Sequence, residues 1–132
     1  MAKGQLLVVE DEPNTLMALK DRLEFEGYQV KTAMDGETAL EEVHAEAPDC
    51  MILDIMLPKI DGFKVCRLLK FDPKYRSVPI IMLTARSQER DKALGKETGA
   101  DEYLVKPVDM DKVVEKVNEY VVRAEASRAA RE

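Results

Sequence analysis

Residues 50–62 read CMILDIMLPKIDG, a short apolar run that ends on Asp54 and is followed by a turn up to Gly62. An apolar run of this length before a turn is typical of a strand buried in a parallel sheet. Three other runs also end on polar residues: 6–9 before Glu10, Asp11 and Glu12, 80–83 before Thr84, and 103–105 before Lys106. Open α/β sheets bind ligands just beyond the carboxyl ends of their strands. We therefore expect these polar residues to meet at one sheet edge.

Helical patterns separate the apolar runs, so strands and helices alternate five times. The expected strands are 6–9, 28–33, 49–54, 80–84 and 101–105, and the expected helices run from 13 to Gly27, from 35 to Pro48, and over about 63–71, 87–99 and 109–123. Short connections imply right-handed crossovers with helices on both faces. The pattern predicts a flavodoxin-like, doubly wound (βα)5 fold with a parallel sheet in the order 2-1-3-4-5.

In that strand order, the acidic ends of the first and third strands are neighbours. Two carboxylates brought to about 4 Å repel by on the order of 4 kcal/mol at an effective dielectric of 20, and a bound cation relieves that cost. Ligands that are all oxygen suit Mg²⁺ or Mn²⁺. The fifth strand lies roughly 10 Å from the third, so a long side chain such as Lys106 is needed to reach the same place. Carboxylates, a hydroxyl and an amine at one edge indicate a phosphoryl-transfer site.

Composition excludes several other classes of protein. A length of 132 residues fits one domain, and a net charge of −6 argues against direct binding of nucleic acid, which needs clustered Lys and Arg. The sequence contains no apolar stretch near the ~20 residues of a membrane span and no signal peptide at its start. Cys50 and Cys66 lack metal-ligand or redox spacing, so we expect buried free thiols in a cytoplasmic protein.

Four motifs together resemble one family. They are E10-D11-E12, I-L-D54-I-M-L-P58-K-I-D-G62, M-L-T84-A85 and G99-A-D-E-Y-L-V-K106-P107. In this order and at these spacings they resemble the bacterial two-component response-regulator receiver domain, of the CheY-like kind, over about residues 5–123. One position departs from the family pattern, because Glu10 stands where the family usually has Asp. A carboxylate is still present there, one methylene further out.

The resemblance implies a role for each site residue. Asp54 would be the phosphoacceptor, which takes a phosphoryl group from the phosphohistidine of a histidine kinase or a histidine phosphotransfer protein. Mg²⁺ would be bound by Asp11, Asp54 and the Met56 backbone carbonyl, with Glu10 acting through water. Lys106 and Thr84 would contact the phosphoryl oxygens, and Pro107 suggests a cis peptide bond after Lys106. The domain would not be an enzyme in its own right, although it assists its own phosphorylation and a slow autodephosphorylation.

Signal output is also expected from the resemblance. Tyr103 occupies the position of the family's switch aromatic, although a half-exposed strand tyrosine would look the same in sequence. The outward face of the fourth helix, the fifth strand and the last helix is the expected surface for a downstream protein target. Lys112 stands where dimerising relatives usually carry an acid, so its pairing with Lys92 would be repulsive. We therefore expect a monomer or a weak dimer.

Residues 1–123 are expected to form the receiver domain, and residues 124–132 a charged, Ala-rich tail without an output domain. Two interpretations stay open: a single-domain receiver that acts by protein contact, or a receiver cut from a longer protein.

Other functional classes fit less well. An aspartyl-nucleophile phosphatase needs a second Asp two residues after its nucleophile, where this chain has Met56. A toprim-type nuclease site also needs a paired Asp, and this chain lacks that second acid for the same reason. Flavodoxin needs a hydroxyl-rich phosphate loop after the first strand, where Glu10, Asp11 and Glu12 would repel a phosphate. A degenerate receiver used only for interaction would be expected to have lost Asp54 or Lys106, and the sequence retains both.

Overall fold

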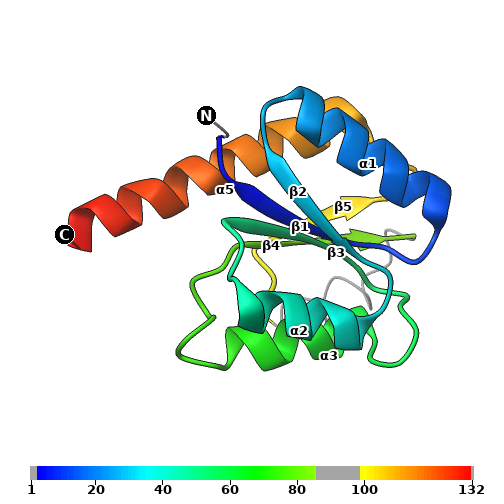
Figure 1. Ribbon diagram of the computed structural model, residues 1–132, viewed down its shortest axis with the longest axis horizontal. Helices are drawn as coiled ribbons and strands as arrows, with labels where there is room; N and C mark the ends of the chain where they lie inside the picture. The colour runs from blue at the N-terminus through cyan, green and yellow to red at the C-terminus, as the bar shows by residue number, and fades with distance from the viewer. Residues whose placement is uncertain (1–2, 86–98, 132) are drawn as a thin grey trace.

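The computed structural model describes residues 3–85 and 99–131 and shows a parallel sheet between two layers of helices (Figure 1). The five strands are β1 (Gln5–Val9), β2 (Gln29–Ala33), β3 (Cys50–Asp54), β4 (Ile80–Thr84) and β5 (Glu102–Val105). Their order is β2-β1-β3-β4-β5, and every neighbouring pair is parallel. The predicted doubly wound fold is confirmed. The helix predicted at 87–99, with Gly95 and Lys92, falls outside the described residues except for its last position.

Among the described residues, helices lie on both faces of the sheet (Figure 1). Helices α1 (Pro13–Phe25) and α5 (Met110–Arg131) lie on one face, and α2 (Gly36–Ala45) and α3 (Gly62–Lys70) lie on the other. Each face has its own apolar cluster, because side chains alternate between the two faces along a strand. Cys50 belongs to the first cluster and Cys66 to the second, and both are buried free thiols as predicted.

Carboxylate side chains cap the N-termini of three of these helices. The side chain of Glu12 accepts hydrogen bonds from the Asn14 and Thr15 amides at the start of α1. Asp35 and Asp61 cap α2 and α3 in the same way. A capping carboxylate satisfies amides that have no partner within the helix. The third acid of the run that follows β1 is therefore occupied at the start of α1.

The structure corrects one interior position of α1. We expected Phe25 on the apolar face with Leu19 and Leu23, but the Phe25 side chain is 84% exposed. Two residues along a helix correspond to a rotation of about 200°, which carries Phe25 to the side opposite Leu23. The helix ends at Phe25, and a left-handed glycine, Gly27 with φ 104°, follows two residues later.

Helix α5 extends to Arg131 rather than ending near residue 123. The added residues, AEASRAAR, are mostly strong helix formers without Pro or Gly, so nothing in them stops the helix. Its final turns continue beyond the edge of the sheet (Figure 1). Neither α5, at 22 residues, nor any other helix in the described ranges is long and apolar enough to cross a membrane.

Candidate functional site

The strand register brings the predicted residues to one edge of the sheet. Val9 lies opposite Leu53, Asp54 lies opposite Leu83, and the last residues of β4 and β5 lie opposite each other. The four neighbouring strands therefore end almost level, and the residues at or just after their ends are Glu10, Asp54, Thr84 and Lys106. These are residues that the sequence pattern predicted for the site.

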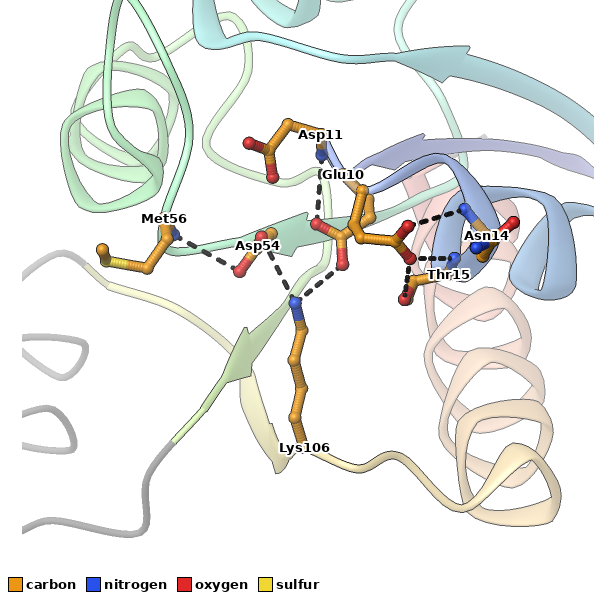
Figure 2. Close-up of polar contacts among 8 residues, drawn as sticks. Glu10, Asp11, Asn14, Thr15, Asp54, Met56 and Lys106 are labelled. Carbon is orange, nitrogen blue, oxygen red and sulfur yellow. Dashed lines mark hydrogen bonds and ion pairs between the residues drawn. The ribbon is translucent and has the colours of Figure 1, made fainter.

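The Lys106 side chain crosses from the end of β5 to two carboxylates (Figure 2). Its Nζ lies 2.7 Å from Oε1 of Glu10 and 3.3 Å from Oδ2 of Asp54. Both carboxylates are buried, with Glu10 0% and Asp54 3% exposed, whereas the Lys106 side chain is 27% exposed. The ammonium therefore lies beside two buried carboxylates, on a side chain that stays partly exposed.

Asp11 completes a group of three carboxylates. One oxygen from each of Glu10, Asp11 and Asp54 lies within 4.8 Å of the others, and Asp11 is the exposed member. Three carboxylate oxygens with one side open to water form a donor set that suits a hard cation such as Mg²⁺, which keeps several waters. The residues present therefore fit a divalent cation at this edge.

Burial and neighbouring charges change the pKa values of Glu10 and Lys106. Burial, reinforced by a hydrogen bond with Asp54, raises the pKa of Glu10 to about 7 against the opposing effect of Lys106. Burial also acts to lower the pKa of Lys106, but the hydrogen bond with Glu10 and the charge of Asp54 outweigh it, so the pKa of Lys106 is raised. Lys106 therefore remains positively charged at neutral pH.

The loop after β3 is held against the helices on both sides. A Cβ on Gly36 would lie 2.0 Å from the Ile60 carbonyl oxygen, and a Cβ on Gly62 would lie 2.1 Å from the Asp54 carbonyl oxygen. Only glycine allows this close backbone approach.

The Met56 amide donates to Oδ1 of Asp54 at 3.3 Å, while the Met56 side chain is 73% exposed. Oδ1 of Asp54 therefore faces a backbone donor and Oδ2 faces Lys106.

The two predicted switch residues lie on β4 and β5. Thr84 is 1% exposed, and its carbonyl oxygen accepts from the Lys106 amide at 2.6 Å. Tyr103 lies opposite Met82, is partly buried, and packs against the apolar cluster on the α2 and α3 face. The Lys106-Pro107 peptide bond is cis, as predicted.

Sequence reasoning missed one contact in the site. It assigned Glu10 to a metal ion through water, whereas the structure shows direct hydrogen bonds from Lys106 and from the Asp11 amide, the latter at 3.0 Å. A signal for this contact was present in the sequence, because Glu in place of Asp adds one methylene of reach.

A family model for the response regulator receiver domain matches residues 6–118. The chain belongs to the response regulator receiver domain family. It is thus a receiver domain of two-component signal transduction, a family of phosphoacceptor signalling modules.

Curated relatives support this membership. The chain is 43% identical over 128 residues to the alkaline phosphatase synthesis transcriptional regulatory protein PhoP of Bacillus subtilis, covering 97% of this chain and 52% of that protein. It is 44% identical over 106 residues to the response regulator PleD of Caulobacter vibrioides, covering 80% of this chain and 23% of PleD. The chain therefore spans about half or less of the length of these relatives.

Solved structures show the same fold. A response regulator from Chloroflexus aurantiacus is 35% identical with a TM-score of 0.86, and the match covers 90% of this chain and 98% of that one. The receiver domain of a sensor histidine kinase from Pseudomonas aeruginosa is 28% identical with a TM-score of 0.83, covering 89% of this chain and 97% of that one. That second structure has a magnesium ion coordinated in its active site cleft.

Proposed function

We propose that this receiver domain accepts a phosphoryl group on Asp54. The observation that carries the proposal is the contact between Oδ2 of Asp54 and Nζ of Lys106, 3.3 Å apart beside two further carboxylates. Phosphoryl transfer passes through a loose transition state, so a protein contributes mainly positioning and neutralisation of charge on the phosphoryl oxygens. A buried carboxylate with an ammonium beside it provides both.

The chemical step follows from these groups. An oxygen of Asp54 attacks the phosphorus of a phosphohistidine in line, so that an O–P bond forms while the P–N bond breaks. The bonding electron pair leaves with the imidazole, which takes up a proton. The donor is a histidine kinase or a histidine phosphotransfer protein. Attack of water on the same phosphorus later breaks the Asp54 O–P bond, releases inorganic phosphate and returns free Asp54, which is a slow autodephosphorylation.

Asp11, Asp54 and the Met56 backbone carbonyl would hold Mg²⁺, with Glu10 acting through water, and Mn²⁺ fits the same oxygen ligands. When bound, the cation neutralises the carboxylates and the incoming phosphoryl oxygens. Lys106 binds a phosphoryl oxygen. The Thr84 hydroxyl donates to another oxygen, and this donation is coupled to the orientation of Tyr103.

Output is proposed to occur by protein contact at the outward face of β5 and α5, together with the fourth helix predicted outside the described residues. The net charge of −6 opposes contact with nucleic acid and with anionic membranes. The expected form is a monomer or a weak dimer, and free buried thiols with a kinase donor favour a cytoplasmic location.

The test is intact-mass measurement after incubation with acetyl phosphate and Mg²⁺. The wild-type protein should gain one phosphoryl group, and Asp54→Asn should gain none. Asp61→Asn is the matched control, because Asp61 lies in the same loop but caps α3, and it should still be phosphorylated. No added group, or a stable group on Ser, Thr or His44, would contradict the proposal.

A further inference from the structure

Glu10 is the most deeply buried acid of the site, and its two oxygens have different partners. Oε2 accepts from the Asp11 amide at 3.0 Å, and Oε1 accepts from Nζ of Lys106 at 2.7 Å. The same ammonium lies 3.3 Å from Asp54. The closer ion pair of Lys106 is thus with Glu10 and not with the proposed phosphoacceptor.

The length of Glu10 explains this geometry. An aspartate at this position would end one methylene earlier, so its carboxylate would withdraw from Nζ by roughly the length of a C–C bond, about 1.5 Å. Charge-assisted hydrogen bonds weaken steeply beyond about 3 Å. A glutamate therefore reaches the ammonium where the shorter acid would not.

We propose that Glu10 is a positioning residue that holds the Lys106 ammonium beside the metal-binding carboxylates, and that the held ammonium lowers the affinity of the site for a divalent cation. The inference rests on the proposed function, because it concerns the same Mg²⁺ site. The Glu10–Lys106 pair would then set the Mg²⁺ concentration at which the domain can accept phosphoryl groups.

The physical reason is repulsion between like charges that share a ligand. Asp54 contacts the ammonium and is also one of the three carboxylates that would surround the cation. Both carboxylates that contact the ammonium are buried, so solvent and salt screen the repulsion less than they would between two fully exposed charges. By linkage, the ammonium weakens binding of the cation by the same factor by which the cation weakens the contact of the ammonium with the carboxylates.

The test is a Mg²⁺ titration without any phosphodonor, followed by calorimetry. Lys106→Met keeps a long side chain but removes the charge, and it should tighten Mg²⁺ binding about tenfold. Glu10→Asp keeps the negative charge but releases the ammonium, and it should tighten binding about threefold. In the Lys106→Met background, the same Glu10→Asp change should alter affinity less than about twofold, because no ammonium remains to be released.

Two matched controls separate this effect from a general change in charge or length. Lys116→Met removes a lysine whose ion pairs are with Glu102 and Glu119, and Glu12→Asp shortens the acid that caps α1. Each should change Mg²⁺ affinity less than about twofold. A second readout is the ¹⁵N signal of the Lys106 ammonium, which should be sharp in wild type and broadened in Glu10→Asp.

The outcomes discriminate between the two proposals. Equal effects of Glu10→Asp in both backgrounds, or an unchanged affinity in Lys106→Met, would overturn the positioning role while leaving the metal site intact. Equal Mg²⁺ binding by wild type and Asp11→Ala would instead show that the proposed metal site is wrong. If Glu10→Asp fails to fold, Glu10→Gln takes its place in the comparison, and an equal effect on Mg²⁺ affinity in the wild-type and Lys106→Met backgrounds would overturn the positioning role.

Discussion

At the scale of single residues, Gly62 controls the position of the proposed phosphoacceptor. A Cβ there would lie 2.1 Å from the Asp54 carbonyl oxygen and 2.8 Å from the Ile55 Cα, and backbone atoms cannot move aside as a side-chain end can. We expect Gly62→Ala to lower the free energy of unfolding by about 2–4 kcal/mol in urea titrations. In Gly4→Ala the new Cβ would meet the Asp49 side chain instead, and the loss should stay below about 1 kcal/mol. Equal losses would contradict this account.

Glu10 should make metal binding depend on pH. Burial and a hydrogen bond with Asp54 raise the pKa of Glu10 to about 7, so a proton competes with Mg²⁺ for the carboxylate cluster on the acid side of neutrality. We expect Mg²⁺ binding to release most of one proton near about pH 6 and almost none near about pH 8.5. Calorimetry in buffers of different ionisation enthalpy measures the number of protons released when Mg²⁺ binds. Glu10→Gln should release almost none at either pH, and equal release by wild type at both would refute the assignment.

At the scale of elements, hydrogen bonds and an ion pair of Lys70 connect the end of α3 to the segments that precede β4 and β5. Its Nζ donates to the carbonyl oxygens of Arg76 at 3.1 Å and Val78 at 2.6 Å, and it lies 2.6 Å from the Asp101 carboxylate. Asp101 in turn accepts from the Ile80 amide at 2.8 Å. The Lys70 side chain is only 9% exposed, so its removal leaves the carbonyl oxygen of the buried Val78 without this donor and Asp101 without this counter-charge.

We expect Lys70→Met to lower the free energy of unfolding by about 2–4 kcal/mol in denaturant titrations. Lys20→Met is the matched control, because Lys20 forms an exposed ion pair with Glu24 one turn away on α1. Exposed pairs of this kind contribute less than about 1 kcal/mol. A loss for Lys70→Met no larger than for Lys20→Met would show that the contacts at the start of β5 do not matter for stability.

At the scale of the whole molecule, we expect the conformational change caused by phosphorylation of Asp54 to extend through β4 to β5. With the phosphoryl mimic beryllofluoride, amide NMR shifts should extend to Tyr103 in wild type. Lys106→Ala should lose most of this response, and Thr84→Ala should show a smaller shift at Tyr103, because each removes one contact to the mimic. Shifts confined to a few residues around Asp54 in wild type, or full propagation in Lys106→Ala, would contradict the proposed switch.

The order of strands and helices and the identity of the site residues follow from local patterns. Runs of three or four apolar residues and the helical spacing of Leu16, Leu19 and Leu23 are visible within short windows, because secondary structure has a fixed period. The polar residues after the runs could be assigned to one edge because parallel strands all end on the same side of the sheet.

Only the tertiary structure decided how those residues share their charges. Lys106 and Glu10 lie 96 positions apart in sequence, and their 2.7 Å contact depends on the register of four strands and on one methylene of side-chain length. The burial of Glu10, which raises its pKa, likewise results from elements packed around it. Patterns in sequence specify which groups meet at an edge, whereas distances and desolvation arise from packing between segments that are remote in the chain.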